Sequence, residues 1–263
     1  MKTMENSSEF DQKGYTVCRG LISPSDIDDL RNRLLAYARA IFSIQCKDWA
    51  ELNALMPQLA LKHPEQRKFF YDLCQLAPEA ALFPQSTAVR KVLSDIGIHN
   101  PVLKNMNLRL DVPDSCDFFL IDWHQDLNNL DCERSCTFWV PLHDLDKNSG
   151  GLSVLDINPF EERQWTSSGA DEYRQVDISR IPSATENQLY PKAGDAVVFN
   201  PYLVHKSLKG IDACRWTVIF RFDCLDTFYQ VTGRNRKSPK MTTDDPYLRS
   251  RGAAGVFQGA PQK

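Results

Sequence analysis

The sequence lacks long apolar runs and any excess of charge of one sign. No stretch reaches the ~18 consecutive apolar residues that a membrane-spanning helix requires, and the opening segment MKTMENSSEFDQKG has no apolar core typical of a signal peptide. Lys and Arg number 31 against 34 Asp and Glu, so no basic field attracts nucleic acid. We therefore expect a cytoplasmic protein that takes a small-molecule substrate, binds neither membranes nor nucleic acid, and is a monomer or a weak homo-oligomer.

The sequence also lacks a recognisable cysteine motif, although it contains 8 cysteines. None is spaced as Cys-x-x-Cys, and Cys132 and Cys136 have no second pair to complete a zinc site. We expect reduced thiols, as is usual inside cells. A chain of 263 residues is long enough to bury a core without disulfides or a structural metal.

The first hundred residues carry helical patterns. The segment Ser23-Pro24-Ser25-Asp26 offers a capping serine, a proline near the first helical position and an early acidic residue. Apolar residues then recur at steps of three and four from Ile27 to Ile41, which predicts an amphipathic helix. A short strand is expected over Thr16–Arg19, and shorter helices over 65–76 and 86–95. Four prolines are expected to cut this region into pieces: Pro57, Pro64, Pro78 and Pro84.

From Asn105 onward the apolar period falls to two, which is typical of β-strands. Many short strands separated by turns predict a mainly β antiparallel barrel or sandwich with flanking helices. We expect one domain over 1–235, with a helical part at about 21–96 and a barrel at about 100–230, followed by a tail over 236–263. The further strand candidates are Phe118–Trp123, Ser135–Leu142, Leu152–Leu155, Gln175–Ile178, Ala196–Asn200 and Trp216–Phe222.

A candidate metal site begins in the segment Asp122-Trp123-His124-Gln125-Asp126. In an extended chain His124 and Asp126 point the same way, so an imidazole and a carboxylate can bind one cation. His205, which follows an apolar run, is the natural third ligand. Two histidines and one carboxylate form the facial triad of non-haem Fe(II) oxygenases. The pair His-x-Asp alone is also compatible with a surface loop, and Asp122 is the alternative carboxylate.

An arginine follows His205 at a spacing of ten residues. If residues 203–208 and 215–221 are adjacent antiparallel strands, one face carries a ligand, a guanidinium and two hydroxyls: His205, Arg215, Ser207 and Thr217. A guanidinium beside hydroxyls can bind the distal carboxylate of 2-oxoglutarate, whose keto-acid end chelates iron. Arg221 is the alternative anchor, and an exposed strand arginine is the alternative interpretation of Arg215.

Six segments together resemble the phytanoyl-CoA dioxygenase-like family in order and spacing, over roughly residues 10–230. They are Trp123–Asp126, Trp139–Leu142, Asn148–Leu152, Lys192–Asp195, His205–Ser207 and Arg215. The resemblance implies a double-stranded β-helix (jelly-roll) core, Fe(II), 2-oxoglutarate as co-substrate, and O2. It also implies catalytic iron ligands at His124, Asp126 and His205, and co-substrate contacts at Arg215 and Ser207.

The expected reaction is hydroxylation of an unactivated C–H bond in a small, polar metabolite, with release of succinate and CO2. Halogenases of this type have a small residue where Asp126 stands, so the carboxylate favours hydroxylation. Candidate substrate contacts are Asn107, Arg109, Gln125 and Trp139. Asn107 and Arg109 could equally form a solvated face of their strand. The loops 127–134 and 158–188 are long enough to act as lids.

A second class of function stays open at this point. Jelly-roll proteins can bind metals or sugars without catalysis, and the same three ligands can hold zinc or nickel. Arg215 distinguishes the two, because a simple binding module has no reason to keep a cation one co-substrate length from the metal.

Overall fold

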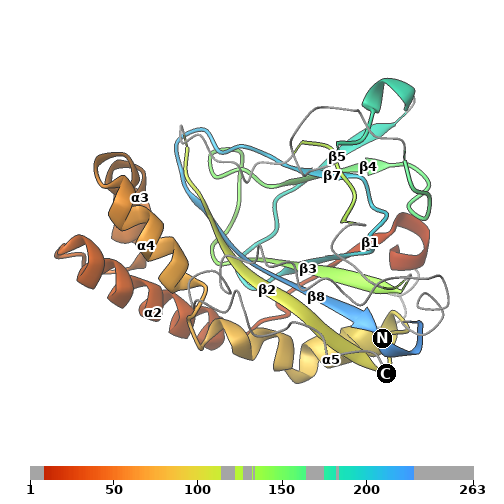
Figure 1. Ribbon diagram of the computed structural model, residues 1–263, viewed down its shortest axis with the longest axis horizontal. Coiled ribbons are helices and arrows are strands. Elements are labelled where there is room, and N and C mark those ends of the chain that lie inside the picture. Colours follow the sequence, from red (N-terminus) through yellow and green to blue (C-terminus); the bar gives the residue numbers. More distant parts are fainter. Residues whose placement is uncertain are drawn as a thin grey trace, which may run out of the picture.

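The structure is a computed structural model that describes residues 9–113, 122–126, 132, 134–163, 175–181 and 184–227. Four α-helices and a 3-10 helix lie between the first two strands (Figure 1). These are α2 (Pro24–Phe42), α3 (Trp49–Lys62), α4 (Pro64–Cys74), η1 (Ala80–Gln85) and α5 (Thr87–Asp95). The strands are β1 (Tyr15–Cys18), β2 (Pro101–Asp111), β3 (Ser135–Pro141), β4 (Leu152–Asp156), β5 (Thr185–Leu189), β6 (Ala196–Phe199), β7 (His205–Ser207) and β8 (Arg215–Cys224), with a short 3-10 helix, η3 (Ile178–Arg180), before β5.

Three helices, α2, α4 and α5, begin at or within one residue of their predicted starts, whereas α3 was not predicted. Ser23 accepts a hydrogen bond from the amide of Asp26 and Pro24 opens α2, so this helix starts at its predicted cap. The expected break at Pro57 is wrong, because this proline lies inside α3. The helix continues through it since buried residues on both sides, Met56 and Ala60, hold the helix against the core.

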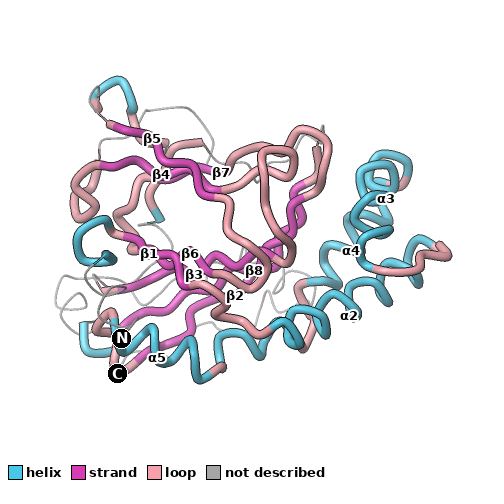
Figure 2. Tube along the Cα trace, turned by 180° about the vertical axis from the view of Figure 1, so that it is seen from behind, coloured by secondary structure: helices cyan, strands magenta, loops and turns pink. Residues whose placement is uncertain are grey.

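The strands form two antiparallel sheets (Figures 1 and 2). The larger sheet has the order β1-β6-β3-β8-β2, and the smaller has the order β5-β4-β7. Side chains alternate between the faces of β8: Trp216, Val218 and Phe220 pack in the cluster that contains the helices, whereas Ile219 packs between the sheets. The odd-numbered residues of β3, of β8 and of β2 from Asn105 onward therefore share the inner face, as their register places them opposite one another. This architecture is mainly β with flanking helices, as predicted.

The assumed pairing of residues 203–208 with 215–221 is wrong. β7 pairs with β4 in the smaller sheet, whereas β8 lies between β3 and β2 in the larger one. The chain crosses between the sheets after Ser207, where the amide of Ile211 donates to the carbonyl of Asn148. A ten-residue spacing fits a hairpin, but here it spans a change of sheet.

Several expectations lie partly or wholly outside the described residues. These are most of the strand candidate Phe118–Trp123, parts of both predicted lids, and the tail over 236–263. The division into one domain and a tail therefore stays a prediction. Within the described ranges, every helix is too short or too polar to cross a lipid bilayer.

Candidate metal centre

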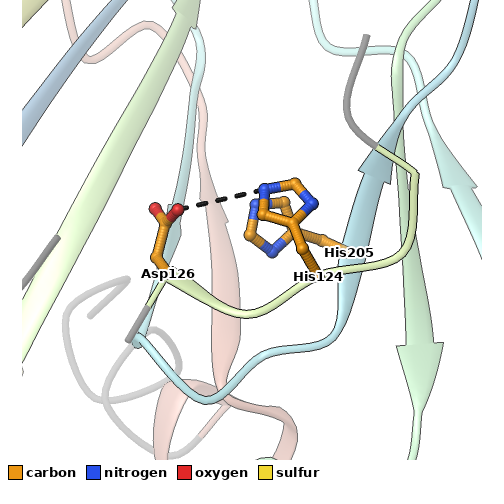
Figure 3. Close-up of side chains that lie close together, drawn as sticks. All are labelled: His124, Asp126 and His205. Carbon is orange, nitrogen blue, oxygen red and sulfur yellow. Dashed lines mark ion pairs between the residues drawn. The ribbon is translucent and has the colours of Figure 1, made fainter. Parts of the chain in front are cut away.

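Backbone pairing brings the three predicted ligands together (Figure 3). The amide of His124 donates to the carbonyl of His205 (2.9 Å), and the reverse bond measures 3.0 Å. Residues paired in this way project their side chains to the same side, and the two ring centroids are 4.2 Å apart. The amide of Asp126 donates to the carbonyl of Pro201 (3.0 Å), which fixes the chain two residues after His124.

The donor atoms of the three side chains lie within 4.8 Å of one another. Nδ1 of His124 lies 2.8 Å from the carbonyl of Asp122, and Nδ1 of His205 lies 2.9 Å from the carbonyl of Leu203. A carbonyl oxygen only accepts, so each Nδ1 carries the proton and each Nε2 offers its lone pair. Nε2 of His124 is 3.9 Å from Oδ1 of Asp126. A metal-binding histidine needs this tautomer, with the proton on Nδ1 held by a carbonyl and the lone pair of Nε2 free for the metal.

Asp126 is held through its other oxygen. Thr137 of β3 donates its hydroxyl to Oδ2 (2.9 Å), and Nε of Arg221 donates to the same atom (3.1 Å). Thr137 and Arg221 are opposite one another in the β3–β8 register, so two neighbouring strands grip one carboxylate oxygen. Oδ1 is the oxygen that faces the imidazoles.

The charges of the three side chains suit a divalent cation. Burial lowers the pKa of His124 to about 3, and burial also lowers the pKa of His205, so both rings are neutral near pH 7. Burial opposes ionisation of Asp126, but the charge of Arg221 and its hydrogen bond outweigh burial and lower the pKa of this carboxyl. Two neutral imidazoles and one carboxylate are the donor set that Fe(II) takes in oxygenases. The residues therefore fit the implied metal.

A second group of charged side chains lies further along the inner face. It consists of Arg109, Asp111 and Arg215, and we call it the arginine cluster. Arg215 donates Nε and Nη2 to Oδ2 of Asp111, at 3.0 and 2.6 Å, and Nη2 of Arg109 lies 3.1 Å from Oδ1 of the same residue. Burial opposes ionisation of Asp111, but Arg215 and Arg109 outweigh it and lower its pKa. The cluster carries one net positive charge.

The two predicted hydroxyls and the alternative anchor lie in different places. Thr217 is fully buried on β8, directly opposite Arg109 in the register. Ser207 lies on β7 two residues after His205, so the two side chains share a face. Arg221 contacts Asp126, as described above, and its Nη1 lies 3.4 Å from Oδ1 of Asn105.

The predicted substrate contacts do not all gather in one place. Asn107 and Arg109 share the inner face of β2, and Asn107 is exposed. Trp139 is buried between the sheets, with its ring centroid 5.7 Å from Cζ of Arg215. Gln125 points elsewhere: its Nε2 donates to the carbonyls of residues 161 (2.8 Å) and 202 (2.5 Å), and its Oε1 accepts from the amide of residue 163 (2.9 Å).

Sequence reasoning missed Thr137 and Asp111. Thr137 is one of several polar residues in an apolar strand, and only its place opposite Arg221 reveals its role. Asp111 shares the parity of Asn107 and Arg109, so the alternation in β2 could have extended the polar face to it. The alternative ligand Asp122 is exposed, and its Oδ1 accepts the amide of Trp123 (2.9 Å).

A family model described as phytanoyl-CoA dioxygenase (PhyH) matches residues 10–209. None of the curated proteins matches the chain. Among solved structures, HygX from Streptomyces hygroscopicus with nickel and 2-oxoglutarate bound is 13% identical, with a TM-score of 0.55 over 84% of this chain and 86% of that chain. The non-heme monooxygenase ThoJ in its apo form is 15% identical, with a TM-score of 0.55 over 83% and 76%.

The epimerase SnoN, in complex with Fe3+, alpha ketoglutarate and nogalamycin RO, is 13% identical, with a TM-score of 0.52 over 84% of this chain and 83% of that chain. At such low identity these likenesses establish the fold. They confirm the predicted double-stranded β-helix core with a helical N-terminal region.

Proposed function

We propose that this chain, which belongs to the phytanoyl-CoA dioxygenase family, is a dioxygenase that uses Fe(II), 2-oxoglutarate and O2. Its family and its fold both indicate a non-haem iron, 2-oxoglutarate-dependent enzyme. We further propose that it hydroxylates an unactivated C–H bond of a small, polar metabolite and releases succinate and CO2. The observation that carries the proposal is the cluster of His124, Asp126 and His205, with donor atoms within 4.8 Å of one another.

In this proposal His124 and His205 hold the metal through Nε2, and Asp126 holds it through Oδ1. Iron bound there supplies, with the co-substrate and O2, the oxidising power for hydroxylation. The protein's own part is to keep the imidazoles neutral, keep the carboxylate ionised, and fix all three by hydrogen bonds to the backbone, Thr137 and Arg221. The triad would hold the keto-acid end of the co-substrate through the metal, and the arginine cluster, with Thr217 and Ser207, would hold its distal carboxylate.

A polar substrate is supported by the inner face of β2. Asn105 is half-buried, Asn107 is exposed, and both share the face of Arg109. A metabolite with hydroxyl or anionic groups can hydrogen-bond to these amides, which a long apolar chain cannot do. Trp139, on the same face, offers a flat apolar wall.

The test is a screen of metabolite pools for compounds that stimulate succinate formation by the Fe(II)-loaded protein with 2-oxoglutarate and O2. The product of any such compound is then analysed by mass spectrometry after reaction under labelled oxygen. A product that has gained one oxygen atom from O2 supports hydroxylation. A product of unchanged mass, or one that has lost two hydrogens, would contradict it and would indicate epimerisation or ring closure instead.

A further inference from the structure

Arg215, at the start of β8, is already engaged by the protein. Its Nε and Nη2 donate to Asp111, and its Nη1 donates to the carbonyls of Gly151 (2.6 Å) and Leu208 (2.7 Å). These bonds use four of the five N–H groups of a guanidinium, and the residue is 1% exposed. Asp111 occupies the edge of the guanidinium formed by Nε and Nη2, which is an edge that can bind a carboxylate through two hydrogen bonds. A co-substrate carboxylate that binds this edge of Arg215 would therefore have to displace Asp111.

Arg109 lies between this locked pair and the metal centre. Along the inner face of β8, the register runs from Arg215 opposite Asp111, through Thr217 opposite Arg109, to Arg221, which contacts Asp126. The side chain of Arg109 is 16% exposed, so it borders accessible space.

Thr217 gives an independent indication that a ligand binds beside Arg109. Its side chain is fully buried, and within the described residues its Oγ1 has no hydrogen-bond partner. Its neighbours in the register are Arg109 on β2 and Pro141 on β3. A buried hydroxyl without a partner is uncommon in native proteins, and an acceptor oxygen of a ligand at this level of the barrel would satisfy it.

The cluster offers a charged donor to an anion. Arg109 and Arg215 both pair with Asp111. A ligand carboxylate beside Arg109 would gain a charge-assisted hydrogen bond without breaking any hydrogen bond of Arg215.

We propose that Arg109, together with Oγ1 of Thr217, binds the distal carboxylate of 2-oxoglutarate, and that Asp111 and Arg215 form the fixed pair that orients Arg109. The anchor then comes from β2 instead of β8, and Arg109 acts on the co-substrate instead of the substrate. This inference rests on the proposed use of 2-oxoglutarate.

The test compares 2-oxoglutarate with 2-oxopentanoate, which keeps the keto-acid end and chain length but has a methyl group in place of the distal carboxylate. Calorimetry measures the binding of each compound to the Fe(II)-loaded protein without oxygen. Arg109→Ala should weaken 2-oxoglutarate binding about 10- to 1000-fold and change 2-oxopentanoate binding less than about threefold. Arg109→Lys should recover part of the loss, because lysine offers a point charge in place of a fork. Thr217→Val should weaken 2-oxoglutarate binding about fivefold.

Two further variants complete the set. Arg33→Ala removes an arginine of α2 that pairs with Glu79 at 2.8 Å, and it should change neither affinity. Arg215→Lys should weaken the preference for 2-oxoglutarate far less than Arg109→Ala does, and it should lower the melting temperature, because it weakens the pair with Asp111 that orients Arg109. Thermal melting also shows that each variant is folded.

The outcomes separate the two levels of the proposal. If Arg109→Ala keeps the full preference for 2-oxoglutarate and Arg215→Lys loses it, Arg215 is the anchor and the inference is wrong while the proposed function stands. If the wild type binds both compounds equally, no distal anchor exists and the inference is likewise wrong. If the folded, Fe(II)-loaded wild type binds neither compound, the proposed function itself fails.

Discussion

The inner face of β8 carries two arginines that each pair with an aspartate, Arg221 with Asp126 and Arg215 with Asp111. In the first pair one carboxylate oxygen takes both donors, from Arg221 and Thr137, and the other faces two imidazoles. In the second pair both carboxylate oxygens accept from arginines. The same two residue types therefore give a candidate metal ligand in one place and a closed ion pair in the other. Their neighbours determine the difference.

The comparison predicts its largest effect at the metal centre. His205→Ala removes one of the three donors, so it should abolish succinate formation from 2-oxoglutarate and tight Fe(II) binding. The barrel should stay folded, because the variant leaves every apolar side chain of the main core clusters in place. Metal titration and thermal melting of the metal-free protein check both statements, with the exposed His99→Ala as the control. Near-normal succinate formation by the His205 variant would show that the triad is assigned wrongly.

At the arginine cluster the expected loss is of stability. Arg215→Ala leaves the buried Asp111 without its two-pronged partner, which should cost about 3–5 kcal/mol of the free energy of unfolding. Urea denaturation measures it. The double variant with Asp111→Asn should lose less, because no unpaired charge is then buried. A loss under about 1 kcal/mol for Arg215→Ala would mean that the pair is dispensable, as exposed pairs are.

A smaller effect is expected from Thr137, whose hydroxyl donates a hydrogen bond to Asp126. Thr137→Val keeps the side-chain shape and removes one hydrogen bond to Oδ2, so it should weaken Fe(II) binding about tenfold. Arg221 still holds the same oxygen. Thr16→Val, which changes a buried threonine of β1 that bonds to Glu9, is the matched control and should leave Fe(II) affinity unchanged. Equal metal affinity in the Thr137 variant and the wild type would show that this bond does not orient the ligand.

The smallest effect concerns pH. The pKa of Asp111 is lowered in the folded protein, so its ionised form contributes stability above the unfolded value of about 3.9, and this contribution is lost as the pH falls toward the folded pKa. The difference in unfolding free energy between the wild type and Asp111→Asn should therefore be constant near neutrality and shrink below about pH 4. Unfolding by urea at a series of pH values measures it. A difference that grows on acidification would mean that the folded state favours protonated Asp111.

The sequence predicted the parts of the site that depend on local spacing. His124 and Asp126 share a side because the chain is extended there, and the same parity sends Gln125 the other way, toward the backbone of residues 161–163. The polar face of β2 was likewise visible from its alternation. His205 was proposed as the third ligand from its place after an apolar run, and the family resemblance implies the same residue.

The parts that sequence could not give depend on which strands pair. Local pattern does not specify that β7 and β8 belong to different sheets, so the assumed hairpin failed. The contacts of Arg215 with Asp111, and of Arg221 with Asp126, follow from the register of β2, β3 and β8 across long stretches of chain. That register is fixed by packing between the sheets and against the helices.

Anaerobic addition of 2-oxoglutarate to the Fe(II)-loaded protein tests the central claim most directly. Chelation of the metal by the keto-acid end should produce a weak visible charge-transfer band that saturates with 2-oxoglutarate and is absent in His205→Ala. If the folded, Fe(II)-loaded wild type shows no such band, the triad does not bind iron and 2-oxoglutarate together. The protein would then be a metal- or sugar-binding jelly roll without this catalytic activity.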